Sequence, residues 1–363
     1  MAHLTSHHTL PPFPDDIETA PLVSVSFSKL ENNDDQASED FFKASKELGF
    51  FYLDFLGSEL GETIVKEAEQ LNKVQKEFFA LPNEVKDVYG RPHLHPFYAY
   101  RYTETEGKDE NGQQLRNANY NLRKDDILGQ CERLACHQLI LEHQELFEKY
   151  VRHCRAAVNV LLSHLNKQLE LPEGTLLNLH RIEERSGDHV RFTQNLPHEF
   201  NEDRARRAEH TDFGSLTVLF NWLGGLQIRK PNTEDDWVYV KPIPGSCIVN
   251  LGDAMVKFTA GILRSNIHRV VPAPSTQSHL TRNSLVFFTR PEDKVILKRL
   301  KGGIIDKQPR SNENEDDEEE MTSHEWIMKR GTGQLPGIFT SKGFEGRTYD
   351  APAHIAPSVS IPA

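Results

Sequence analysis

The chain has 363 residues, of which 37% are hydrophobic and 26% charged, and its formal net charge is -12. A chain of this length can form one large domain or two and bury a sizeable core. The net charge is negative, whereas nucleic-acid-binding proteins typically carry a basic surface, so we expect no DNA or RNA partner.

The N-terminal half is predicted to be rich in helices, after a polar, Pro-rich arm that ends near residue 20. Apolar spacing predicts, in chain order, a strand, a helix, a buried strand and a long helix over residues 22–27, 40–48, 50–53 and 60–80. Residues 91–126 are rich in Pro, Gly, Tyr and Asn, which favours a long surface loop or a hairpin. A second long helix is expected over residues 142–169.

After Gly187 the pattern changes to short strands separated by turn residues. The expected strands cover residues 189–196, 215–220, 226–229, 237–239, 247–251, 266–271 and 284–288. Such even spacing is typical of an antiparallel sandwich or barrel. Beyond the strands we expect an acidic, mobile loop over residues 311–320 and one further helix over residues 323–330.

The cysteines and the lengths of the apolar runs indicate the cellular compartment in which we expect the protein. Four cysteines are scattered along the chain, which is typical of reduced thiols rather than of a disulfide framework. No secretory signal pattern is visible at the N-terminus, and no apolar run has the length of a membrane span. We therefore expect a cytoplasmic protein without membrane contact, and no protein partner is evident.

Two polar pairs, each with a spacing of two residues, interrupt apolar segments of the second half. His210 and Asp212 form an H-x-D pair, and Arg282 and Ser284 form an R-x-S pair. Side chains two residues apart point to the same face of a β-strand, so each pair is expected to enter one pocket. Turn glycines between the pairs would fold the strands back and bring His268 to His210. Two histidines and one carboxylate form the facial ligand set of a non-haem Fe(II) site.

The ordered segments HTDFGSLTVL, GGLQ, PGSCIVNLGD, HRVV and RNSLVFF resemble one known superfamily. This is the 2-oxoglutarate/Fe(II)-dependent dioxygenases, in the branch of isopenicillin N synthase and the plant flavonoid and gibberellin dioxygenases. FFKASKELGFFYL and FFALP resemble the N-terminal domain of that branch, and YNLRKDD resembles its fungal members.

The resemblance implies an α+β or mainly β fold. A distorted double-stranded β-helix (jelly roll) would carry the site, with N-terminal helices packed on one sheet and a C-terminal helix. The implied regions are a flexible arm, a helix-rich N-terminal dioxygenase region, the jelly-roll core and a C-terminal extension, over residues 1–20, 21–182, 183–295 and 296–363.

The resemblance also implies the ligands and the reaction. His210, Asp212 and His268 would hold Fe(II), while Arg282 and Ser284 would bind the far carboxylate of 2-oxoglutarate, as a guanidinium readily does. Oxygen and 2-oxoglutarate would be consumed, with succinate and CO2 as co-products. A small organic molecule, in the setting of specialised metabolism, would be hydroxylated, desaturated or cyclised.

Three further residues are expected at the site. Family members carry an Asn-x-Tyr-Pro segment whose Asn and Tyr help to bind 2-oxoglutarate. The equivalent segment here is Gln194–Pro197, in which Gln194 is expected to replace the Asn. Leu196 cannot replace the Tyr hydroxyl, so the co-substrate would be bound differently here. Phe213 and Asn221 are expected to contact the substrate.

Two alternatives to this function stay open. One is an Fe(II) oxidase of the same fold that needs no 2-oxoglutarate. Isopenicillin N synthase and aminocyclopropane-carboxylate oxidase are such enzymes, and this chain resembles both in its R-x-S region, so that region does not separate the two functions. The other is a non-catalytic jelly-roll binding protein, whose mark would be the loss of a ligand. None of the three ligands is lost.

Overall fold

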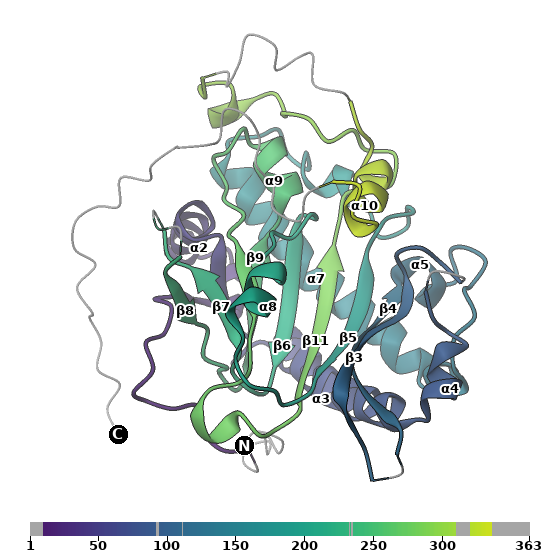
Figure 1. The fold of residues 1–363 in the computed structure, drawn as a ribbon. Helices are drawn as coiled ribbons and strands as arrows, with labels where there is room; N and C mark the ends of the chain where they lie inside the picture. The colour runs from purple at the N-terminus through teal and green to yellow at the C-terminus, as the bar shows by residue number, and fades with distance from the viewer. Residues whose placement is uncertain are drawn as a thin grey trace.

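The computed structural model describes residues 10–91, 94–110, 112–231, 233, 235–309 and 320–335 (Figure 1). The expected acidic loop lies outside the described residues except for Glu320. No helix in this part of the chain combines the length and the apolar character needed to cross a bilayer.

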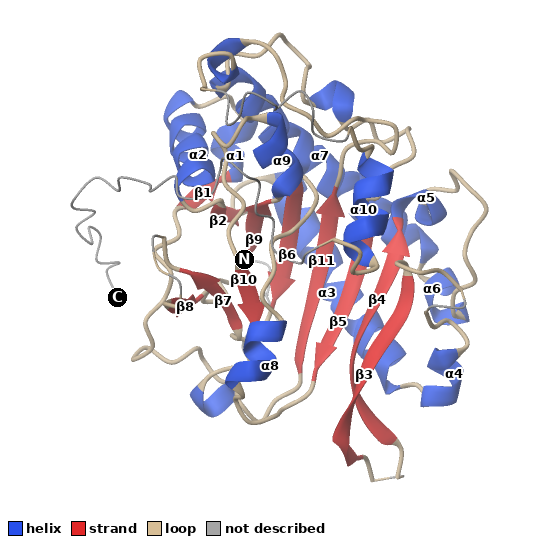
Figure 2. Ribbon diagram, turned by 45° about the horizontal axis from the view of Figure 1, so that its top comes forward, coloured by secondary structure: helices blue, strands red, loops and turns tan. Residues whose placement is uncertain are grey.

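The strands form two sheets (Figure 2). The large sheet has eight strands in the order β1-β2-β9-β6-β11-β5-β4-β3, and the small sheet has three in the order β10-β7-β8. The strands are β1 (Ser24–Ser26), β2 (Phe50–Asp54), β3 (Ala99–Lys108), β4 (Gln114–Arg123), β5 (His189–Asn195), β6 (Leu216–Asn221), β7 (Leu226–Arg229), β8 (Trp237–Tyr239), β9 (Ser246–Leu251), β10 (His268–Val270) and β11 (Arg282–Thr289).

The helices gather mainly on one side of the large sheet (Figure 1). They are α1 (Phe27–Glu31), α2 (Asp35–Glu47), α3 (Glu59–Ala80), α4 (Asn83–Asp87), α5 (Lys124–Ile127), α6 (Gln138–Glu142), α7 (Gln144–Gln168), α8 (Glu202–Arg207), α9 (Asp253–Phe258) and α10 (Ser323–Gly331). The long helices α3 and α7 and the C-terminal helix α10 match the expected ones closely. The short helices α8 and α9 lie where the sequence predicted none.

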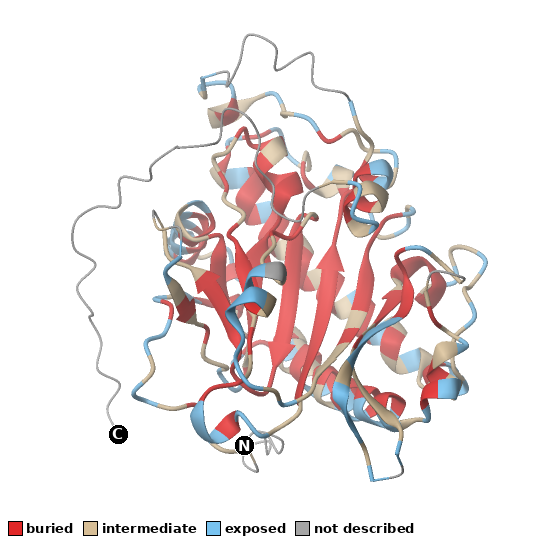
Figure 3. Cartoon of the chain, in the orientation of Figure 1, coloured by how far each residue is buried: buried red, intermediate tan, exposed pale blue. Residues whose placement is uncertain are grey.

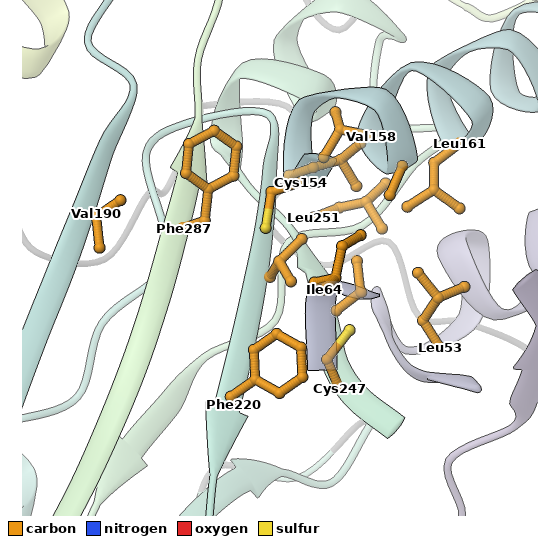
Figure 4. Packing of buried hydrophobic residues seen from close by; sticks show 14 of the residues in the cluster. Leu53, Ile64, Cys154, Val158, Leu161, Val190, Phe220, Cys247, Leu251 and Phe287 are labelled. Carbon is orange, nitrogen blue, oxygen red and sulfur yellow. The ribbon is translucent and has the colours of Figure 1, made fainter. Parts of the chain in front are cut away.

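Alternation along the strands separates two cores. On the helix side of the large sheet, residues such as Val190, Phe220 and Phe287 share one hydrophobic core with Cys154 and Leu161 of α7 (Figure 4). On the opposite face, the alternate residues of the same strands pack against the small sheet. The central strands are thus buried on both faces, as Figure 3 shows in red.

The two facing sheets with helices on one side form the distorted jelly roll that the sequence predicted. The segment expected as a loop or hairpin is the hairpin of β3 and β4, and β4 pairs with β5 of the large sheet. The first strand is shorter than expected, because Ser26 caps helix α1 directly after it. We call the face of the large sheet opposite the long helices the inner face.

Candidate active site

His210 and His268 are brought together by a pair of backbone hydrogen bonds. The His210 amide donates to the His268 carbonyl at 3.1 Å, and the His268 amide donates to the His210 carbonyl at 3.0 Å. This bridge joins the chain before β6 to the small sheet, since His268 is the first residue of β10. Directly opposed side chains of an antiparallel pair lie on the same face. The two imidazole rings are accordingly 4.2 Å apart, centroid to centroid.

Asp212 completes the group. Its Oδ1 lies 3.8 Å from His210 Nε2 and 3.9 Å from His268 Nε2. All three ligand atoms lie within 4.8 Å of one another. The expectation that His210 and Asp212 sit on one strand is wrong, because β6 begins only at Leu216. The residues between have no regular structure and bend at Gly214 and Ser215, and we call this segment the turn of Asp212. The same three side chains nevertheless converge.

The turn that carries Asp212 is held by the start of α9. The Asp253 amide donates to the Asp212 carbonyl at 2.7 Å, and the Ala254 amide donates to the Gly214 carbonyl at 3.1 Å. A Cβ on Gly252 would lie only 2.3 Å from the Gly214 oxygen. Glycine is therefore required where these two backbone segments approach each other.

Hydrogen bonds leave the correct atoms of all three side chains available for a metal. His210 Nδ1 lies 2.9 Å from the Ala208 carbonyl, and His268 Nδ1 lies 3.1 Å from the Asn266 carbonyl, so each Nδ1 donates and each Nε2 carries the lone pair. Partners of this kind fix the tautomer of metal-binding histidines.

Hydrogen bonds also orient the Asp212 carboxylate so that one oxygen stays available for a metal. Its Oδ2 accepts hydrogen bonds from Thr217 Oγ1 and Asn250 Nδ2, both at 2.7 Å, which leaves Oδ1 for a metal. Burial alone would raise the pKa of Asp212, but the two histidines and these hydrogen bonds lower it to about 2. Burial and the neighbouring His268 lower the pKa of His210 to about 4. At neutral pH the donor set is therefore one carboxylate with a neutral His210, which fits a divalent iron ion.

Arg282 and Ser284 lie on the inner face at the start of β11. Arg282 is 3% exposed; its Nε donates to the Gly224 carbonyl at 2.9 Å, and its Nη1 lies 3.4 Å from Ser284 Oγ. Among the described residues no acidic side chain forms an ion pair with Arg282. Burial lowers the pKa of Arg282 to about 10, so the guanidinium stays charged at neutral pH. A buried cation without a counter-ion fits a carboxylate ligand.

Gln194 does not meet the expectation that it lies beside this pair. The register pairs Gln194 with Asn283, whereas Arg282 pairs with Asn195 and Ser284 pairs with Thr193. Because paired residues share a face, Gln194 points to the helix side of the sheet. Thr193 and Asn195 share the inner face with Arg282 and Ser284, and the motif comparison had missed both.

The two residues expected near the substrate are separated. Asn221 lies opposite Ser284 in the register of β6 and β11, and its Nδ2 donates to the Leu223 carbonyl at 3.2 Å. Phe213 lies beside Asp212, and its ring centroid is 6.2 Å from that of Phe97. Asn221 thus neighbours the Arg282–Ser284 pair, whereas Phe213 directly follows Asp212 of the His-Asp-His group.

A jelly roll with two histidines and one carboxylate facing its interior defines the class of non-haem iron oxygenases. Residues 186–291 match the model of the 2OG-Fe(II) oxygenase superfamily, and residues 20–132 match that of the N-terminal region of the non-haem dioxygenases, named for morphine synthesis.

Relatives extend the match over most of the chain. A 2-oxoglutarate-dependent dioxygenase of Aspergillus fumigatus is 31% identical over 317 residues, which are 81% of each chain. A 1-aminocyclopropane-1-carboxylate oxidase of Dictyostelium mucoroides is 27% identical, over 78% of this chain and 85% of its own. The crystal structure of Neurospora crassa T7H with alpha-KG and 5-formyluracil has the same fold, with a TM-score of 0.67 and 20% identity over 88% of this chain and 98% of its own.

The chain therefore belongs to the 2-oxoglutarate/Fe(II)-dependent dioxygenase family. It is an oxidoreductase, and its reaction uses Fe(II), 2-oxoglutarate and O2, as the sequence predicted. Enzymes of this family act on small-molecule substrates.

Proposed function

We propose that His210, Asp212 and His268 hold the Fe(II) and that the enzyme oxidises a small specialised metabolite. The observation that carries the metal assignment is the convergence of three ligand atoms, each left available by the hydrogen bonds of its own side chain. The iron, when bound, supplies the activation of O2 that couples 2-oxoglutarate decarboxylation to oxidation of the substrate.

We further propose that Arg282 and Ser284 bind the far carboxylate of 2-oxoglutarate, with Thr193 and Asn195 taking the place expected for Gln194. The buried guanidinium of Arg282, which forms no ion pair within the described part of the chain, supports this role. Thr193 supplies a hydroxyl next to Ser284, which offsets the hydroxyl that Leu196 lacks. Asn221, opposite Ser284, would also lie at the co-substrate end of the site rather than at the substrate.

The metal assignment is tested with His210→Ala and its matched control, His279→Ala. His279 is exposed and outside the group. We expect His210→Ala to lose tight Fe(II) binding and succinate formation, and His279→Ala to retain both. Wild-type turnover of 2-oxoglutarate by His210→Ala would reject the assignment.

The co-substrate assignment is tested with Arg282→Met. One charge-assisted hydrogen bond contributes about 1.5–3 kcal/mol, so 2-oxoglutarate affinity should fall about 10- to 100-fold while Fe(II) affinity changes little. Equal losses of both affinities would point to damage of the fold instead.

The alternative that the sequence left open is an Fe(II) oxidase that does not use 2-oxoglutarate, and one relative, of Dictyostelium mucoroides, carries the name of aminocyclopropane-carboxylate oxidase. The family model and the relative of Aspergillus fumigatus, which is more similar, support the use of 2-oxoglutarate instead. Oxygen consumption measured with and without 2-oxoglutarate separates the two. We expect consumption to depend on 2-oxoglutarate and to produce one succinate for each 2-oxoglutarate.

We also propose a cytoplasmic location. The four cysteines are unbonded, and Cys154 and Cys247 lie in the same buried core on neighbouring elements (Figure 4). Thiols that stay reduced are typical of a reducing compartment. Fractionation of cells that express a tagged chain, with soluble and organelle markers followed in parallel, tests the location.

A further inference from the structure

We propose that Arg191 binds a carboxylate of the substrate, so that the enzyme selects small organic acids over neutral molecules. The proposal rests on the proposed function, because it places the substrate beside the iron and the co-substrate. The observations behind it concern Arg191, which is not among the residues assigned to Fe(II) or to 2-oxoglutarate.

Arg191 faces the same side of the sheet as the rest of the site. In the register of β5 and β11 it lies opposite Val286, between the pair Thr193–Ser284 and the pair His189–Phe288. On the other side of β11, Phe288 pairs with Thr217, whose hydroxyl donates to Asp212. Arg191 therefore stands on the inner face between the proposed metal ligands and the proposed co-substrate residues.

One edge of the Arg191 guanidinium is fixed by the protein. Its Nε donates to Asn121 Oδ1 at 2.7 Å, and its central carbon lies 4.7 Å from the centre of the Phe288 ring. Among the described residues, no other hydrogen bond and no ion pair of Arg191 is found. The two terminal nitrogens remain for a ligand, and a guanidinium held in this way can bind a carboxylate through both.

Two other arginines near the inner face, Arg290 and Arg330, already have partners. Arg290 donates to the Gly187 carbonyl and to His189 Nδ1, and Arg330 pairs with Asp253. Arg282 is the residue assigned to 2-oxoglutarate. The polar groups next to Arg191 also point to a ligand: Asn119, on the neighbouring strand β4, has a buried Oδ1 for which the described residues supply no partner.

The charges of the loaded site leave Arg191 unbalanced. Burial, and then the nearby Arg290, lowers the pKa of Arg191 to about 9, so it is still charged at neutral pH. The two positive charges of the iron and the one of Arg282 balance Asp212 and the two carboxylates of 2-oxoglutarate. The positive charge of Arg191, whose side chain is partly buried, then has no ion-pair partner among the described residues, and an anion that pairs with it there is stabilised. A carboxylate on the substrate supplies that anion.

The test uses a library of small carboxylic acids and their methyl esters. Binding is measured by thermal shift, and then by calorimetry for the best pair, on protein loaded with Mn(II) and 2-oxoglutarate. We expect acids to bind and to be preferred over their esters about 10- to 100-fold. Arg191→Met should abolish that preference and Arg191→Lys should keep part of it, because Lys retains the charge without the two-pronged geometry. Arg152→Met, which removes an exposed arginine from α7 on the opposite side of the sheet, should keep the preference.

Four results would overturn the proposal. The first three are the absence of any acid that binds, equal binding of acids and esters by the wild-type protein, and an unchanged preference in Arg191→Met. A parallel fall of 2-oxoglutarate affinity in Arg191→Met would also overturn it, because Arg191 would then serve the co-substrate. Failure of the proposed function looks different: acids would still be preferred through Arg191, but the wild-type protein would form no succinate.

Discussion

A buried ion pair joins the helix α10 to the start of α9, beside the turn that carries Asp212, and breaking that pair should destabilise the protein strongly. Arg330 Nη2 lies 2.8 Å from Asp253 Oδ2, and the two side chains are 2% and 0% exposed. Thr211, between the proposed ligands His210 and Asp212, donates to the same carboxylate oxygen at 2.9 Å. Arg330→Met would leave that carboxylate buried without its cation.

Removal of one partner of a buried ion pair costs about 3–5 kcal/mol. The lower end of that range is expected here. Burial already raises the pKa of Asp253 to about 7 beside Arg330, so the carboxyl can take up a proton once the guanidinium is gone. We therefore expect Arg330→Met to lower the free energy of unfolding by about 3 kcal/mol at neutral pH. The double variant Arg330→Met/Asp253→Asn should recover much of this loss, because no charge is then left buried.

Urea unfolding, followed by both tryptophan fluorescence and circular dichroism, measures the effect. The matched control is Lys149→Met, which breaks the exposed pair of Lys149 and Glu145, 2.6 Å apart, and should leave the transition unchanged. A loss below about 1 kcal/mol for Arg330→Met, or a double variant less stable than the single one, would refute the reasoning.

Three further outcomes follow from the structure. Burial lowers the pKa of His180 to about 3, so its contribution to stability is complete above its unfolded pKa of about 6.5 and is lost as the pH falls from there towards 3. Between pH 7 and pH 5 this single group should remove about 2 kcal/mol, and urea unfolding of His180→Gln should show a correspondingly weaker pH dependence. Asn250→Ala removes a hydrogen bond to Asp212 and should weaken Fe(II) binding about 10- to 100-fold in a metal titration; unchanged affinity would contradict the role given to this bond. Gly252→Ala places a Cβ against the Gly214 carbonyl and should lower the free energy of unfolding by about 1–3 kcal/mol, whereas a neutral effect would mean that the two segments separate freely.

The features that the sequence predicted well are local in their physical origin. The helices α3 and α7 follow from apolar residues at helical spacing, and Ser58 caps the start of α3 through the Gly61 amide at 3.0 Å. The strands of the second half follow from short β-prone runs between turn residues. The R-x-S pair shares a face simply because β11 is a regular strand.

The features that the sequence could not predict are the particular contacts that join distant segments. The sequence predicted that His268 would meet His210, but not the single backbone bridge that joins them across 57 intervening residues, nor the short helix α9, whose first turn binds the turn of Asp212. The ion pair of Arg330 with Asp253 joins residues 77 positions apart. Neither spacing nor propensity encodes such pairs.

The placement of Gln194 shows how a motif comparison and strand parity can disagree. The motif aligned Gln194 and Leu196 with the family's Asn and Tyr, whereas Val190 and Phe192 are apolar and lie in the helix-side core. A strict alternation from those two residues puts Gln194 on the core side, and puts Arg191, Thr193 and Asn195 on the inner face. The alternation of faces was therefore present in the sequence. It was hard to recognise because position 194, on the core side, carries a polar residue instead of an apolar one. Parity of this strand, rather than the motif, is what identifies both the proposed co-substrate residues and the arginine that we assign to the substrate.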